Sequence, residues 1–249
     1  MPALTVATYN IHKGFSRFNQ RLVLHELREG LRTLNADIVF LQEVLGENHL
    51  HRRRFQNYPA ASQHDFLAEQ RWLHCAYGKN SVYDAGHHGN AILSRFPILS
   101  WGNRDISAHR FEHRGLLYSQ VELPQAATVI HCFCAHLGLF ARGRRTQLRD
   151  MVQHIARRVP DGEPLIIAGD FNDWRGEVSP VLARELGLCE VFEHCQGQAA
   201  KTFPMPVPML ALDRIYVRGL DILAGEVHSA RPWDKISDHA ALSAHFRLP

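Results

Sequence analysis

The 249-residue chain lacks a strong charge of either sign: 28 Lys and Arg residues face 25 Asp and Glu residues, a net charge of +3 with histidines neutral. Basic nucleic-acid binders usually gather more charge on one face, so composition alone does not indicate such a partner. No apolar run approaches the roughly 20 residues that span a membrane, and no charged N-terminal region precedes a long apolar stretch. We therefore expect a soluble, cytoplasmic protein.

Cysteine is scarce and unpatterned, with five residues, an odd number, and no CxxC pair. Cys132 and Cys134 lie two apart in an apolar run. On a strand they would share one face and serve as small core residues. Without the paired spacings of a zinc site or a redox centre, the cysteines fit a reducing compartment best.

The chain also lacks a low-complexity linker, so we expect a single domain over residues 1–249. Strand-like apolar runs recur along it, at residues 4–11, 38–42, 90–94, 115–123, 127–135, 164–168, 213–218 and 240–247. Leucines at helical spacing predict a helix between Gln20 and Asn35. Apolar residues from Leu148 onward predict a second helix, which Pro160 closes. Residues 45–88 are weakly patterned, and we expect loops and short helices there.

Two segments repeat one plan. Residues 4–43 and 127–173 each run strand, helix, strand. Such units predict an α/β fold in which two sheets pack face to face and helices cover them. All four strands end in a polar residue, and these are Asn10, Glu43, His136 and Asp170. Because ligands in such folds gather at strand ends, we expect the four to share one rim.

Asn10 and Glu43 together offer an amide oxygen and a carboxylate at the ends of buried runs. A carboxylate at the edge of a core needs a partner, because an unpaired charge there is costly. A sparse set of hard oxygen donors is typical of magnesium sites, where water and substrate complete the octahedron. A purely structural Asn–Glu hydrogen bond explains the pair equally well.

Further polar residues stand at the edges of later strands. The segment GDFND places Asp170 and Asn172 two apart after an apolar run. LDRIYV puts Asp213 at the head of a strand, and SDHAAL puts Asp238 and His239 before the last one. A single Asp–His pair at a strand start is often part of a turn. Five separate strand edges that carry such residues are not well explained by turns.

With these motifs the chain resembles the endonuclease/exonuclease/phosphatase superfamily, which has the DNase-I-like fold. The motifs that carry the resemblance fall in family order and cover nearly the whole chain, and they are TYNIH, QE, GNAILSR, HRG, AHLG, GDFND, LDRIYV and SDH. The resemblance implies a four-layer α/β/β/α sandwich with two packed β-sheets flanked by helices.

The resemblance also implies roles for individual residues. Glu43 and Asn10 would hold magnesium, for which manganese can substitute, with Asp238 as a further ligand. Asp170 would orient or deprotonate the attacking water, and Asn172 would donate to the phosphate or the water. These roles supply the activated nucleophile and the charge neutralisation that phosphate-ester hydrolysis requires.

Histidines and one arginine complete the implied site. His239, oriented by Asp213, resembles the histidine of a hydrolase triad. Arg114 and His136 would contact the phosphate, and His136 could protonate the leaving group. Family members are described with either a histidine or the GDFN aspartate as the general base, and both assignments are open here.

Two motifs depart from or compete with this pattern. His12 stands where several nuclease branches carry an acid. Strand alternation puts it on the side of Asn10, where an imidazole suits a phosphate better than magnesium. Residues 109–113 spell HxxEH, a zinc-peptidase pattern that works only on a helix. We reject that motif, because it lies in an expected hairpin.

From these residues and the resemblance we expect a magnesium-dependent phosphoesterase, nuclease-like, that acts on phosphodiesters. Arg114 and His136 suggest the branch that contains DNase I, sphingomyelinases and phosphoinositide phosphatases. The substrate is thus a nucleic acid or a phospholipid headgroup, because fold does not decide function. A non-catalytic binding member of the fold predicts the loss of Glu43, Asp170 or His239, and all three are present.

Overall fold

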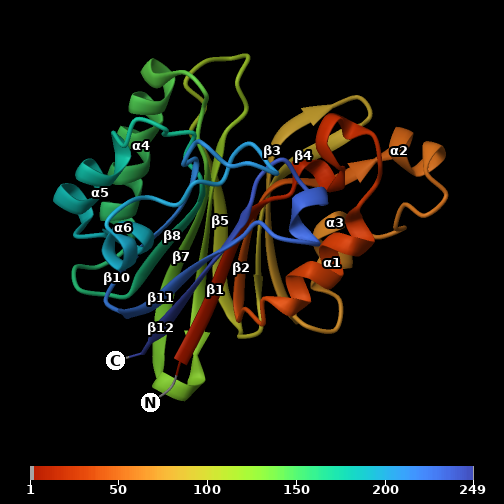
Figure 1. Ribbon diagram of the computed structural model, residues 1–249. Helices are drawn as coiled ribbons and strands as arrows, with labels where there is room; N and C mark the ends of the chain where they lie inside the picture. Colours follow the sequence, from red (N-terminus) through yellow and green to blue (C-terminus); the bar gives the residue numbers. More distant parts are fainter. Residues whose placement is uncertain (1–2, 249) are drawn as a thin grey trace.

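The computed structural model describes residues 3–248, which form two six-stranded β-sheets packed face to face with helices on both outer sides (Figure 1). The first sheet has the strand order β11 (Asp221–His228), β12 (Ala241–Arg247), β1 (Ala3–Asn10), β2 (Ile38–Asn48), β4 (Gly86–Ser94) and β3 (His74–Tyr83). The second has the order β5 (Ile98–Asp105), β6 (Gly115–Leu123), β7 (Thr128–His136), β8 (Leu165–Asp170), β10 (Asp213–Arg218) and β9 (Cys189–Glu190). The expected four-layer α/β/β/α sandwich is confirmed.

The helices divide between the two outer faces. On the first sheet lie α1 (Leu24–Thr33), α2 (His49–Arg54) and α3 (Gln63–Ala68), and on the second lie α4 (Ala141–Arg158) and α5 (Val178–Leu186) (Figure 1). The short helix α6 (Val191–Gln196) packs instead at the edge between the sheets, where Val191 and Phe192 join the inter-sheet core. Short 3-10 turns are η1 (His12–Gly14), η2 (Arg17–Asn19), η3 (Pro124–Ala126) and η4 (Trp233–Lys235). Over the described residues, no helix is both long and apolar enough to span a membrane.

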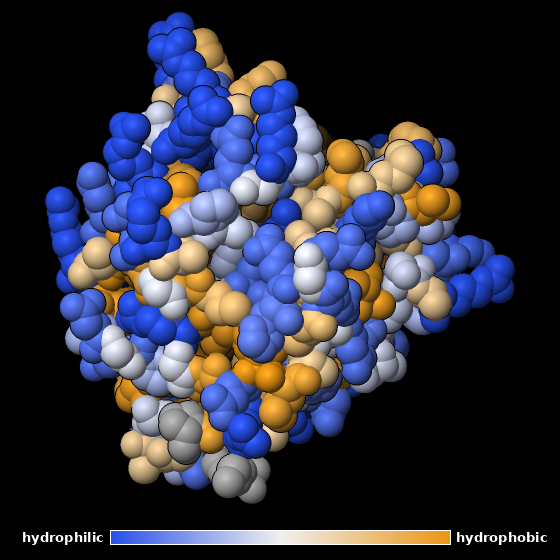
Figure 2. Space-filling model, turned by 60° about the vertical axis from the view of Figure 1, so that its left-hand side comes forward, coloured by the Kyte–Doolittle hydropathy of each residue, from blue (hydrophilic) through white to orange (hydrophobic). Residues whose placement is uncertain are grey.

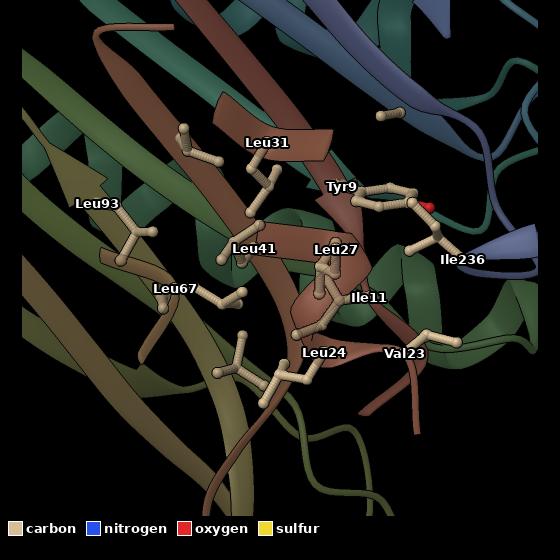
Figure 3. Close-up of a cluster of buried hydrophobic side chains, with 14 of the residues drawn as sticks. Tyr9, Ile11, Val23, Leu24, Leu27, Leu31, Leu41, Leu67, Leu93 and Ile236 are labelled. Atoms are coloured by element: carbon tan, nitrogen blue, oxygen red, sulfur yellow. The ribbon is translucent and has the colours of Figure 1, made fainter. Parts of the chain in front are cut away.

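Three buried clusters separate the four layers. Alternate strand residues such as Val6, Phe40 and Ile166 fill the space between the sheets, together with Cys132 and Cys134. The leucine face of α1 packs on the outer side of the first sheet, where Leu27 and Leu31 lie near Leu41 (Figure 3). A third cluster lies under α4 and α5. Each sheet is therefore buried on both faces, which explains its long apolar runs.

The two repeated units form the expected parallel crossovers. β1 pairs in parallel with β2 across α1, and β7 pairs in parallel with β8 across α4. Their registers set Asn10 opposite Gln42, and His136 opposite Asp170. The carboxyl ends of these strands consequently lie at one end of the sandwich, where the polar residues collect.

The structure corrects the expectation for residues 45–88. The short helices α2 and α3 are there, but β2 continues to Asn48, and β3 together with the start of β4 fills much of the remainder. No apolar run predicted β5, β9 or β11. These strands and β3 lie at the four sheet edges. Edge strands are covered on fewer sides, so they lack the apolar runs of central strands.

Candidate active site

Asp170 lies at the centre of the polar cluster, at the end of β8, and is 2% exposed. Asn10 Nδ2 donates to Asp170 Oδ2 at 3.1 Å, and the Asn172 amide N–H donates to Oδ1 at 2.9 Å. His136 Nε2 stands 3.5 Å from Oδ2 and His239 Nε2 stands 3.9 Å from it. Burial and the nearby Asp213 carboxylate raise the pKa of Asp170 to about 7.

His239 and Asp213 form a buried pair beside Asp170. The distance from His239 Nδ1 to Asp213 Oδ2 is 2.8 Å. Burial works against the charged imidazole, but Asp213 and Asp170 outweigh it and raise the pKa of His239 to about 10. The expected pairing of the two residues is therefore present, with His239 in its protonated form at neutral pH.

The loop that begins at Thr202 holds this pair in place. Thr202 Oγ1 accepts the backbone N–H groups of Leu212 and Asp213, each at 3.3 Å. The Phe203 ring lies with its centroid 5.0 Å from that of His239. The Thr-Phe pair thus positions the head of β10 and one face of the imidazole.

Glu43 lies on β2 with a backbone φ of +58°, at an irregularity in its pairing with β4. Within residues 3–248, its polar contacts are long: Asn10 Nδ2 at 3.5 Å and Lys13 Nζ at 3.9 Å. Its side chain is 22% exposed. A strained backbone and a carboxylate without a close partner are typical of a residue that is available to bind a hard cation.

Asp238 is the third expected metal ligand, and His12 holds it. The distance from His12 Nδ1 to Asp238 Oδ1 is 3.1 Å. This contact raises the pKa of His12, and it lowers that of Asp238 in spite of the carboxylate's burial. His12 therefore reaches the site, but through the tight turn of η1, where its φ is +45°, rather than by strand alternation.

The site offers two sets of donor atoms, of which the first fits a divalent cation. Glu43, Asn10 and Asp238 offer the sparse hard oxygens expected from the sequence. Among the described residues, Asp170, Asp213 and His239 also place one ligand atom each within 4.8 Å of the others. That second group is fully buried, and its histidine is already paired with Asp213.

His136 and Arg114 lie on the second sheet's side. Burial lowers the pKa of His136 well below its ordinary value, and the positive charge of Arg114 adds to this. His136 is therefore neutral at pH 7. Arg114 lines a hollow of about 290 Å³ beside the site.

Asn172 contacts the protein backbone. Its Nδ2 donates to the Leu137 carbonyl at 2.9 Å, and its φ is +50°. It thereby ties the end of β7 to the end of β8. Gly169, just before Asp170, has a φ of +147°, and a Cβ there would lie 1.9 Å from the Ala135 carbonyl oxygen.

The nine other residues singled out in the sequence lie around Asp170, and further residues join them. Ser237 Oγ donates to the Asn10 carbonyl at 2.7 Å and accepts from the His239 backbone N–H at 3.3 Å. Lys13 faces Glu43, and His88 stands near His136. Ser237 is the first residue of the SDH segment and Lys13 directly follows TYNIH, so proximity to those motifs was the available signal.

Comparisons with known proteins agree with this geometry. The Endonuclease/Exonuclease/phosphatase family model matches residues 7–239. The chain is 46% identical to the uncharacterized protein YbhP of Escherichia coli K12 over 243 residues, 98% of this chain and 96% of that protein.

Two solved structures share the fold. An endonuclease/exonuclease/phosphatase from Beutenbergia cavernae is 21% identical with a TM-score of 0.78, over 99% of this chain and 72% of that one. D. rerio TDP2, complexed with a single strand DNA product, is 21% identical with a TM-score of 0.71, over 99% of each chain. The protein described here belongs to the endonuclease/exonuclease/phosphatase family.

Proposed function

We propose that the protein is a divalent-metal-dependent phosphodiesterase that hydrolyses its substrate with an activated water. The observation that carries the proposal is the position of Asp170, buried between His136, His239 and Asn10. Hydrolysis of a phosphodiester needs a base for the water, positive charge at the phosphoryl oxygens and stabilisation of the leaving oxygen.

Asp170 is the base in this scheme. A raised pKa of about 7 makes the carboxylate a stronger proton acceptor than an exposed one, while much of it is still ionised near neutral pH. His239 is less suited, because a pKa of about 10 keeps it protonated. The His239–Asp213 pair instead supplies fixed positive charge, oriented by the carboxylate.

His136 and Arg114 contact the phosphoryl group. Because His136 is neutral at pH 7, it donates a hydrogen bond rather than a proton, which changes the role expected from the sequence. Glu43, Asn10 and Asp238 would hold the metal, magnesium or manganese. The chemistry that such an ion supplies when bound is neutralisation of the phosphoryl and leaving oxygens.

Nucleic acid is the proposed class of substrate. The TDP2 structure with a single strand DNA product supports it, since that protein has the same fold over its whole length. A lipid headgroup has no comparable support. A non-catalytic role is disfavoured, because Glu43, Asp170, Asp213 and His239 are all present in one site.

A substrate panel tests the proposal. DNA, RNA, bis-p-nitrophenyl phosphate, sphingomyelin and phosphoinositides are each incubated with Mg²⁺, Mn²⁺ or EDTA. We expect hydrolysis of the nucleic acids and of bis-p-nitrophenyl phosphate with either metal, and none with EDTA. Activity confined to dispersed lipid would overturn the nuclease assignment.

A further inference from the structure

A hollow of about 450 Å³ opens beside Glu43, and none of the ten residues predicted from the sequence lines it. Lys13 lines the hollow, and its Nζ lies 3.9 Å from Glu43 Oε2. A group seated there would therefore be attached within a few bonds of a phosphate at the metal site. The volume falls within the range of about 300–1,000 Å³ typical of small-molecule sites.

Aromatic rings face the hollow from two separate elements. On one side, the centroid of the Phe15 ring, just after η1, lies 5.3 Å from that of Phe55, just after α2, and 4.8 Å from that of His51 in α2. On the other side, the β3–β4 hairpin contributes Tyr83 and His88, whose ring centroids lie 5.9 Å apart. A space bordered by flat rings favours a flat aromatic ligand.

The charge of the hollow is positive. Lys13 and Arg54 line it, and among the described residues the lining contains no carboxylate. The pKa of His51 is lowered by burial, and the charges of Arg54 and Lys13 contribute. The hollow is thus suited to a planar ring that carries an anionic group.

The hollow beside Arg114, described above, adjoins this one. His88 lines both hollows, and Arg114 lines the second one. The second also presents Phe111 and Phe140, which are 75% and 76% exposed. Near the top of the face drawn in Figure 2, hydrophobic residues are exposed among strongly hydrophilic ones. Basic side chains interleaved with aromatic rings are the pattern of grooves that bind single-stranded nucleic acid.

We propose that the hollow between Phe55 and Tyr83 seats an unpaired base of a single-stranded nucleic acid, next to the phosphate that is cleaved. The proposal rests on the proposed function and narrows its substrate. A base held in a duplex is stacked on its neighbours and paired, so it must leave the helix to enter such a space. The protein should accordingly prefer single strands to duplexes.

Dinucleotides test the proposal, because each contains one phosphodiester. The values of kcat/KM are measured for thymidylyl-thymidine and for its two analogues that lack one or the other thymine. For the wild-type protein, loss of the seated base should lower kcat/KM at least about fivefold, since stacking of one base contributes about 1–3 kcal/mol. Loss of the other base should have a smaller effect.

The variant Tyr83→Ala removes a half-exposed ring from one wall. We expect its discrimination between the intact and the base-deficient dinucleotide to shrink at least about fivefold. Trp101→Ala is the matched control, because Trp101 is an exposed aromatic residue on β5 outside both hollows. It should keep the wild-type discrimination.

A binding measurement gives a readout apart from turnover. A single-stranded oligonucleotide that contains 2-aminopurine is titrated with protein in EDTA, and quenching of its fluorescence reports stacking. We expect the wild-type protein to quench the fluorescence and Tyr83→Ala to quench it less. Binding of the protein should also quench the same strand less when that strand is in a duplex.

The outcomes separate the two proposals. If the wild type cleaves all three dinucleotides at equal rates, or if Tyr83→Ala and Trp101→Ala behave alike, the base-binding inference is wrong while the phosphodiesterase assignment stands. If the wild type cleaves no phosphodiester with any metal, the proposed function fails, and the inference fails with it.

Discussion

Asp213 and Asp170 stand opposite each other in register across the antiparallel strands β10 and β8. Two buried carboxylates this close to each other repel, and the repulsion adds to the effect of burial in raising the pKa of Asp170. His239 lies against both, 2.8 Å from Asp213 and 3.9 Å from Asp170. The Asp213 carboxylate therefore affects the pKa of both Asp170 and His239, and its removal alters the charge of these two groups.

Asp213→Asn should lower hydrolysis by roughly 10²–10⁴-fold, because the amide no longer fixes or charges the imidazole. It should also move the pH profile, since the pKa of His239 falls. Initial rates from pH 5 to 10 check this against Asp221→Asn, an exposed aspartate on β11. An unchanged profile would count against the pairing.

The same pair makes a prediction about stability. The folded-state pKa of His239 is raised from 6.5 to about 10. The pair therefore makes its full contribution to the free energy of unfolding below pH 6.5, and this contribution is lost as the pH rises to about 10. Urea denaturation at pH 6 and pH 10 measures it. Asp213→Asn should lose more free energy of unfolding at pH 6 than at pH 10.

Glu43→Gln should raise the magnesium concentration for half-maximal activity at least about tenfold, equivalent to about 1.4 kcal/mol of binding. The glutamine amide has nearly the same shape as the carboxylate but lacks its negative charge, so it is a weaker ligand for the cation. Glu47→Gln on the same strand is the control, since Glu47 is exposed and does not line the site. An equal magnesium requirement in both variants would remove Glu43 from the metal site.

Glu190 gives a test away from the catalytic cluster. It caps α6 by accepting the Glu193 N–H at 2.7 Å, and burial raises its pKa from 4.5 to about 7. Ionising it in the folded protein is therefore unfavourable, and stability should fall between pH 4.5 and pH 7, by roughly 3 kcal/mol at most. Glu190→Gln keeps the acceptor oxygen and should flatten this part of the pH–stability curve. A curve identical to wild type would refute the burial effect.

Gly169→Ala should destabilise the protein by at least about 2 kcal/mol, because its Cβ would meet the Ala135 carbonyl oxygen and its φ is +147°. Gly102→Ala is the matched control, since the structure places nothing within 4 Å of that Cβ. Thermal unfolding compares the two. Equal effects would mean that the close approach of β7 and β8 is not maintained.

Sequence patterns predicted the central strands well and the edge strands poorly. β1, β6 and β8 are buried on both faces, so their apolar runs mark them. β3, by contrast, reads HCAYGKNSVY and is largely half-buried or exposed. Its strand conformation comes from pairing with β4, a long-range contact that local sequence does not encode.

The candidate site was predictable where polar residues end buried strands. Asn10, Glu43 and Asp170 stand out because apolar runs precede them. His88 and Tyr83 do not stand out in the same way, because they lie in the segment without clear periodicity. The neutral state of His136 could not be predicted from the sequence either, because it depends on burial and on the charge of Arg114, just before the neighbouring strand β6.

The most direct test of the account is hydrolysis of a phosphodiester by wild-type protein and by Asp170→Asn, each with Mg²⁺ and with EDTA. We predict turnover for the wild type in Mg²⁺, its loss in EDTA, and a decrease of at least about 10³-fold in the variant with an unchanged circular dichroism spectrum. Turnover by Asp170→Asn near the wild-type rate would contradict the account.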